Sequence, residues 1–251
     1  MSGMDGDMEL AVENLRKAGM ASATKKEGRA TNEGLIGYTE TADTISLVEV
    51  NSETDFVAKN ENFHAFVGNI ATEVANSSPE SIETFLKQTY SQDSNLSIEE
   101  YRATNVQLLG ENLVIKNVFA MKKNPNHSYG IYSHMNGKIV VVVECSEAGR
   151  EDVARDVAMH VAAEAPEYLN ATDVPASVVE KEKEIARSQI QGKPENIIDK
   201  IVDGKVRSFY DQFCLNNQKY IKDSSVSVEK FLQNLSKDLK VTHFVRWQVG
   251  G

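Results

Sequence analysis

The chain has 251 residues, a formal net charge of −10 at neutral pH and 41% hydrophobic residues. This composition is typical of a globular protein and excludes a disordered or fibrous chain. Its two cysteines are too few for a disulfide framework, and a chain of this length buries a stable core without one. The acidic balance argues against broad nucleic-acid binding, which requires a cationic face.

Targeting signals and membrane spans are not evident in the sequence. No apolar stretch approaches the roughly 20 residues of a membrane-spanning helix. The first residues, MSGMDGDMEL, lack the basic and then apolar pattern of a secretory signal. We therefore expect a cytoplasmic protein without a membrane partner; an organelle origin after removal of a transit peptide stays open.

The first predicted element is a short helix over residues 7–17. Its apolar residues Met8, Val12 and Leu15 fall on one face at helical spacing. Residues 22–31 are polar and contain two lysines and a glycine, which is typical of a linker.

The next part of the chain predicts a small lobe of strands and helices. A hairpin is followed by a polar loop, an amphipathic helix, two shorter helices and a strand. Ser97 precedes the last helix and Glu100 follows three residues later, which is the pattern of a capping box. The predicted ranges are 35–38 and 45–50 for the hairpin, 51–60 for the loop, 62–75, 80–88 and a segment from 97 for the helices, and 114–121 for the strand.

The second half repeats this order. A hairpin over 129–133 and 138–144 turns at Asn136-Gly137, a strong turn signal. A helix over 151–163 follows, and residues 157–164 match residues 66–73 in pattern. The shared order favours an internal duplication. A helix near 226–239 and a strand over 241–249 complete this half.

A charged segment interrupts the second half. Residues 178–190 predict a helix, Gly192-Lys193-Pro194 predicts a turn, and apolar residues recur at helical spacing over 197–213. Two amphipathic helices joined by a tight turn form an antiparallel helical hairpin. This arm either contacts a partner or mediates self-association. The chain as a whole therefore predicts an α+β fold: two duplicated lobes, each a small antiparallel sheet packed by helices, with a protruding helical hairpin.

No enzyme signature is found. The chain lacks a phosphate-binding loop, a zinc-protease motif and a CxxC pair, and its histidines have no metal-ligand spacing. A nucleophilic Cys145 activated by His160 or His134 is one alternative. A buried structural cysteine is the favoured interpretation, because free cysteines are usually buried.

The most informative stretch covers residues 49–59, which read EVNSETDFVAK. Here a strand ends, and a loop then presents Asp55 beside Phe56. On residue types alone the favoured interpretation is structural, with Asp55 as a cap and Phe56 packed beneath the loop, since most loop aromatics are tucked in.

This stretch resembles the signature of the elongation factor Ts family, the guanine-nucleotide exchange factors of elongation factor Tu. All eleven residues fit the family pattern without a mismatch. The resemblance covers nearly the whole chain from Gly6 onward. It includes residues 10–17, 110–112, 158–163, 192–194 and 220–223.

The resemblance implies a domain organisation. The family usually begins with a three-helix domain of ubiquitin-associated type, whose opening Leu-Arg-x-x-Thr-Gly segment is not found here. We therefore expect a remnant of that domain at the start of the chain. The expected divisions are 1–20 for the remnant, 21–33 for a linker, 34–124 for the N-terminal core lobe, 125–177 with 223–251 for the C-terminal core lobe, and 178–222 for the arm.

The resemblance also implies a function and a partner. We expect a non-catalytic exchange factor, with no cofactor or metal of its own, that binds GDP-bound elongation factor Tu and promotes exchange of GDP for GTP. No direct contact with nucleic acid is expected, and the arm would support a homodimer or a 2:2 complex. The alternative is a binding scaffold of the same fold that has lost exchange activity with the missing helices.

The resemblance assigns partner-binding residues to both lobes. Asp55 and Phe56 would push between helices of the partner's nucleotide-binding domain and disturb its Mg²⁺ site, with Thr54 and Val57 on either side. On the second lobe, Met159 and His160 would press near the phosphate loop. The competing interpretation of His160 is a helix-surface histidine without a role. Lys26 is a further candidate contact, although a solvated linker charge is the more ordinary interpretation.

Overall fold

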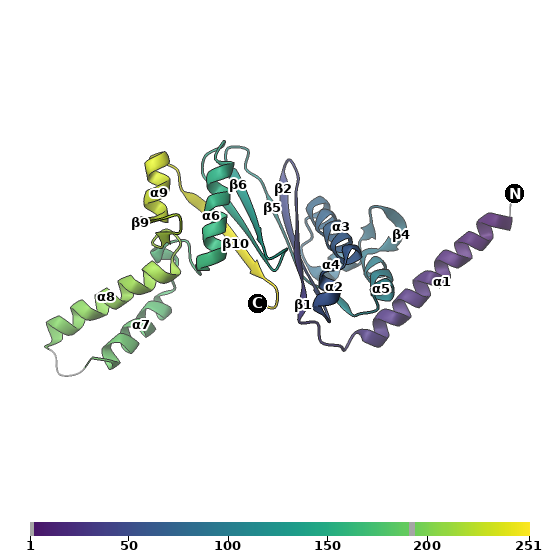
Figure 1. Ribbon diagram of the computed structural model, residues 1–251, viewed down its shortest axis with the longest axis horizontal. Helices are drawn as coiled ribbons and strands as arrows, with labels where there is room; N and C mark the ends of the chain where they lie inside the picture. Colours follow the sequence, from purple (N-terminus) through teal and green to yellow (C-terminus); the bar gives the residue numbers. More distant parts are fainter. Residues whose placement is uncertain (1–2, 191–193) are drawn as a thin grey trace. The chain divides into compact units, whose positions relative to one another are not determined.

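The computed structural model describes residues 3–190 and 194–251, without the side chains of residues 3–12 and 15. The fold is α+β, as expected, and forms two compact units (Figure 1). The first unit comprises residues up to 124 with 133–140 and 247–251, and the second comprises 125–132 and 141–246. Within the described residues, no helix is both long enough and apolar enough to cross a bilayer.

The first unit is built on a three-stranded antiparallel sheet in the order β1-β2-β5. Strand β2 is buried along its whole length, and helix α3 packs on β1 and β2 through Phe63, Phe66 and Ile70. The capping box predicted at Ser97 and Glu100 is confirmed. The strands are β1 (Glu33–Glu40), β2 (Thr44–Ser52) and β5 (Leu113–Lys122), and the helices are α2 (Asp55–Ala58), α3 (Glu61–Ser77), α4 (Ile82–Leu86) and α5 (Ile98–Leu109).

The N-terminal helix α1 (Gly3–Lys26) is longer than the sequence predicted. It runs beside α5 (Figure 1), so the polar residues 22–26 are helical and do not belong to a linker. Contacts with α5 explain the difference: Ala23 is buried, and the Lys26 ammonium donates to the Ser22 hydroxyl and the Val106 carbonyl, at 2.8 and 3.5 Å. Packing of this kind outweighs a weak intrinsic pattern.

The second unit holds most of a sheet in the order β10-β7-β6. Helices α7 and α8 lie side by side as an antiparallel hairpin (Figure 1). Of the turn predicted between them only Pro194, which precedes α8, lies within the described residues. The strands are β6 (Ser128–His134), β7 (Ile139–Cys145) and β10 (Val241–Gln248), and the helices are α6 (Glu151–Glu164), α7 (Ala176–Ser188), α8 (Glu195–Phe213) and α9 (Val228–Leu235), with a 3₁₀ turn over Ala171–Asp173.

The two compact units do not follow the expected domain limits everywhere. The β6–β7 turn, residues 133–140, groups with the first unit: the Ile36 N–H donates to the Gly137 carbonyl at 2.8 Å, and Lys138 pairs with Glu33. The helical hairpin groups with the second unit. The division into lobes and an independent arm stays a prediction.

Two short β-ribbons repeat the same structure in the two units. They consist of β3 (Thr89–Tyr90) with β4 (Asp93–Ser97), and β8 (Lys219–Tyr220) with β9 (Asp223–Ser227). The two ribbons pair in the same register, and each leads into a helix that is capped by a serine. The tyrosine of each ribbon stacks on an aromatic residue of that helix, with the ring centres 4.1 Å apart. The sequence analysis missed both ribbons, although residues 88–100 and 218–230 are visibly similar. The ribbons support the expected duplication.

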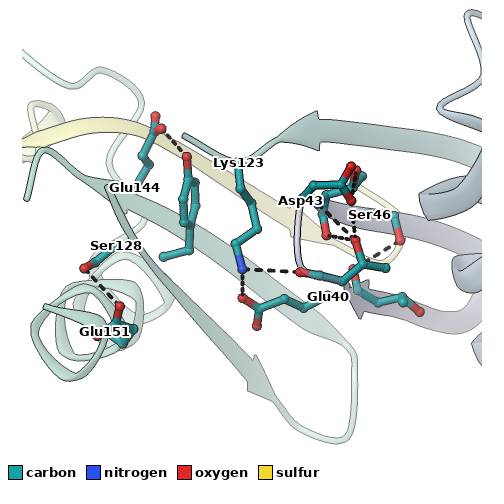
Figure 2. A network of polar contacts seen from close by, with 11 residues as sticks. Glu40, Asp43, Ser46, Lys123, Ser128, Glu144 and Glu151 are labelled. Atoms are coloured by element: carbon teal, nitrogen blue, oxygen red, sulfur yellow. Dashed lines mark hydrogen bonds and ion pairs between the residues drawn. The ribbon is translucent and has the colours of Figure 1, made fainter. Parts of the chain in front are cut away.

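Figure 2 shows polar side chains at the ends of β1 and β6 and next to the end of β5. In the first unit, the Lys123 ammonium donates to the Glu40 carboxylate at 2.6 Å and to the Thr41 carbonyl at 3.3 Å. In the second unit, the Ser128 hydroxyl accepts from the Arg150 N–H at 2.7 Å and donates to Glu151 at 3.3 Å. Helix α6 has no side-chain cap of its own, so Ser128 of β6 caps it.

Gly130 allows helix α6 to lie directly on β6. A Cβ atom at this position would meet the Arg155 nitrogen at 2.1 Å and the Ala154 carbonyl carbon at 2.2 Å, and both are backbone atoms. We expect Gly130→Ala to lower the free energy of unfolding by about 1–3 kcal/mol, because the helix must move away from the strand. The measurement is thermal unfolding followed by circular dichroism.

Gly204→Ala is the matched control for this prediction. Gly204 lies in helix α8 of the same unit, and a Cβ there has no neighbour within 4 Å. Its Tm should stay the same or rise, since alanine favours a helix more than glycine does. Equal Tm values for the two variants would show that the close approach at Gly130 costs nothing.

Candidate functional site

Phe56 is the most exposed of the large hydrophobic side chains in the described part of the chain, at 80%. It belongs to the four-residue helix α2, which the sequence analysis took for part of a polar loop. Successive side chains of a helix point about 100° apart, so a single helical turn directs some side chains toward the core and others toward solvent. Ala58 is buried and Val57 packs against the core, which leaves Phe56 facing solvent. The expectation that Phe56 packs beneath the loop is therefore wrong.

Thr54 fixes the start of helix α2. Its hydroxyl oxygen accepts from the Val57 N–H at 3.4 Å and caps the helix. Its hydroxyl and its backbone N–H both donate to the carboxylate of Glu111, at 2.6 and 3.0 Å. One carboxylate therefore holds both polar groups by which Thr54 can donate.

A second set of contacts holds the preceding residue. The Glu53 carboxylate accepts from the backbone N–H of Asn112 at 2.6 Å and from Arg29 at 3.3 Å. Asn112 is 1% exposed, and its side chain donates to the carbonyls of Glu27 and Arg29 at 3.3 and 3.2 Å. Sequence reasoning noted residues 110–112 only as part of the resemblance and missed their contact with the loop.

Charged pairs lie near the exposed ring. The Lys59 ammonium donates to the Asp55 carboxylate at 2.6 Å, and this hydrogen bond holds the pKa of Asp55 below its ordinary value, with a smaller contribution from Lys138. Lys138 in turn pairs with Glu33. An apolar centre with a polar surround is the usual composition of a protein-binding surface.

His160 occupies a different kind of position from the one that the sequence suggested. Its side chain is 0% exposed, so it is not a helix-surface histidine. Its Nε2 lies 2.9 Å from the Gln218 side-chain oxygen, and its Nδ1 accepts from the Ile221 N–H at 3.2 Å. Burial lowers its pKa, so the ring is neutral at pH 7 and carries its proton on Nε2. Met159, the adjacent residue on α6, is partly exposed.

The remaining predicted site residues fall into two groups. Lys26 is half-buried, and its ammonium group is used within the first unit at the end of α5. The first group lies around α2 in the same unit and consists of Thr54, Asp55, Phe56 and Val57. The second group, Met159 and His160, belongs to the second unit.

The structure does not favour cysteine chemistry. Burial raises the pKa of the Cys145 thiol to about 12, so the nucleophilic thiolate does not form at neutral pH. The His160 nitrogens are already engaged by Gln218 and Ile221. Among the described residues, no three histidine, cysteine or acidic side chains are grouped to hold a metal ion.

Comparison with known proteins gives a consistent match over the chain. The profile of the family described as "Elongation factor TS" matches residues 53–251. A protein named elongation factor Ts from Protochlamydia amoebophila is 55% identical over 251 residues, covering 98% of this chain and 89% of the relative. Proteins of the same name from Chlamydia caviae and Chlamydia muridarum are 42% and 41% identical with the same coverage.

The buried His160 predicts a pH dependence of stability. Its folded-state pKa is lowered, whereas in the unfolded chain it titrates near its ordinary value of about 6.5. Below that pH the unfolded state binds more protons than the folded state, so the free energy of unfolding falls as pH drops. We expect His160→Gln to reduce this loss between pH 7 and pH 5 in urea-unfolding experiments.

The comparison uses the change in stability with pH, since the substitution also alters packing. His243→Gln, at an exposed histidine, is the control for replacing a histidine by glutamine. Parallel pH profiles for the native chain and His160→Gln would contradict the prediction.

Proposed function

Because the chain belongs to the elongation factor Ts family, we propose that it binds GDP-bound elongation factor Tu and promotes the release of GDP and its exchange for GTP. As a member of this family it is a translation elongation factor. The single observation that best supports the proposal is Phe56, an aromatic side chain held 80% exposed on a braced helical turn. We call Asp55 and Phe56 the wedge.

An exposed phenylalanine forgoes stabilisation that burial would provide. Full burial of such a side chain contributes roughly 1.5–3 kcal/mol. A partner that offers an apolar slot recovers this free energy on binding, and aromatic anchors of this kind are frequent hot spots of protein interfaces. The position suits this role, because helix α2, which carries Phe56, follows the fully buried strand β2 after only two residues.

The proposed mechanism is displacement without covalent chemistry. Phe56 enters between helices of the partner's nucleotide-binding domain, and Asp55 meets polar groups there. Their entry disturbs the Mg²⁺ that neutralises the GDP phosphates. Each tenfold loss of GDP affinity corresponds to about 1.4 kcal/mol of coupling. Coupling is reciprocal, so nucleotide binding weakens the grip of this protein on its partner and releases it.

The remaining candidate residues and the helical hairpin also have roles under this proposal. Met159 is partly exposed on α6 and makes the contact near the phosphate loop. His160 supports that contact from within, because its buried ring links α6 to the backbone at Ile221. Lys26 contributes through the α1–α5 pairing, and the helical hairpin of α7 and α8 is the candidate for self-association.

The direct test is release of a fluorescent GDP analogue from elongation factor Tu, measured by stopped flow. A release rate that rises with the concentration of this chain supports the exchange function. Binding without acceleration, with the chain shown to be folded, would favour the exchange-deficient scaffold instead.

Truncation of the wedge provides a sharper prediction. We expect Phe56→Ala to lower the GDP release rate at least several-fold, since the apolar contact that forces the partner's helices apart is lost. The fold should be intact, because Phe56 is exposed. Stopped-flow release and thermal unfolding measure the two properties.

Leu108→Ala is the matched control. Leu108 is another exposed hydrophobic side chain of the first unit, 65% exposed on α5. Its truncation removes apolar surface from a helix other than α2 and should leave the release rate unchanged. An equal effect of both truncations would remove Phe56 from the mechanism.

A further inference from the structure

We infer that Glu111 is a positioning residue for the wedge and acts through Thr54. This inference rests on the proposed function. Glu111 lies in the connection between α5 and β5, 57 residues from Thr54 along the chain. Its carboxylate accepts both the hydroxyl and the backbone N–H of Thr54, and we call this pair of hydrogen bonds the Glu111 clasp.

Helix α2 depends on the clasp because it cannot hold its own position. It has only four residues, and a helix of this length is unstable without contacts from outside. Its inward side chains are the small Ala58 and the partly buried Val57. The hydroxyl of Thr54 therefore has two tasks: it caps the helix through Val57, and it anchors the helix to Glu111.

The neighbouring residues form a second link of the same kind. Glu111 accepts the backbone N–H of Thr54, and Glu53 accepts the backbone N–H of Asn112. Glu53 and Thr54, between β2 and α2, are thus joined to Glu111 and Asn112, between α5 and β5. Each of the two segments supplies one carboxylate and one backbone N–H to the other. The buried side chain of Asn112 extends this link to the backbone after α1.

The second unit joins the corresponding connections by a different, single hydrogen bond between side chains. There the connection after β7 and the connection between α9 and β10 are joined by Ser236, whose hydroxyl donates to Glu147 at 2.6 Å. No helix corresponding to α2 lies between β7 and α6. Side-chain hydrogen bonds thus join these connections in both units, and only in the first unit does the joined segment lead into a helix like α2.

Without the Glu111 clasp, Asp55 and Phe56 would be less well ordered before they meet the partner. Ordering a loop side chain on binding has an entropic cost, and a helix held by the Glu111 clasp is already ordered before binding. Loss of the clasp should lower the GDP release rate at saturating concentration of this protein, because Phe56 enters the partner less often in the productive position.

The first experiment examines the free protein and needs no partner. Hydrogen–deuterium exchange of the amides of residues 57–60 reports whether α2 stays formed, since these N–H groups donate to Thr54, Asp55, Phe56 and Val57. We expect at least tenfold faster amide exchange in Thr54→Val and Glu111→Ala. Thr54→Ser, which keeps the hydroxyl, should behave as the native chain, as should Ser236→Ala. Native-like protection in Thr54→Val and Glu111→Ala would overturn the inference.

The second experiment measures GDP release from elongation factor Tu. Glu111→Ala should be several-fold slower than the native chain at saturation, and Ser236→Ala should equal it. The decisive comparison is a double-mutant cycle: Glu111→Ala combined with Phe56→Ala should be no slower than Phe56→Ala alone. If the fold-losses in GDP release rate of the two single variants multiply in the double variant, Glu111 acts independently of Phe56, and its positioning role is overturned.

The two experiments separate the inference from the function on which it rests. A native chain that leaves GDP release unchanged overturns the proposed function and, with it, any role of the clasp in nucleotide exchange. Faster amide exchange together with normal GDP release in Glu111→Ala leaves the proposed function standing and overturns the inference alone.

Discussion

Burial of strand β2 is the constraint on which the first unit depends. All nine of its residues are buried, so both neighbouring strands and helix α3 must be in place before the strand is stable. Its polar residues need partners inside the fold: Glu49 accepts from the Asn117 side chain at 2.8 Å and from the Gly250 N–H at 3.2 Å. A strand held this firmly gives a fixed end, and two connecting residues lead from it to α2, whose second residue is the exposed Phe56.

The two units show what a shared plan determines and what it leaves free. Both units contain a short β-ribbon, a helix capped by serine and a stacked aromatic pair. In both, a side-chain hydrogen bond also joins the connection after the hairpin to the connection before the last strand. What differs is the chain between the second strand of each hairpin and the following helix. In the first unit this segment forms α2, and in the second it leads directly to α6. The first copy therefore carries one helical turn, with the exposed Phe56, for which the second copy has no counterpart between β7 and α6.

Much of this fold could be predicted from the sequence, because most of its elements follow hydrophobic periodicity. The hairpins, α3, α6 and the capping box at Ser97 are local patterns of this kind. The extent of α1 could not be predicted, since its last turns are held by contacts with α5 about 80 residues away. At the site, Asp55 and Phe56 stood out through their neighbours, whereas Glu111 carries no local signal of its contact with Thr54. The burial of His160 likewise depends on Gln218, which lies 58 residues further along the chain.

The caps of the two main helices differ in origin, and this makes one helix depend on its sheet more than the other. Helix α3 is capped by Asn60, the residue directly before it, so its first turn can begin locally. Helix α6 is capped by Ser128, which belongs to a strand more than twenty residues earlier. The cap of α3 is therefore local to its own stretch of chain, whereas the cap of α6 exists only where β6 and the start of the helix are packed together.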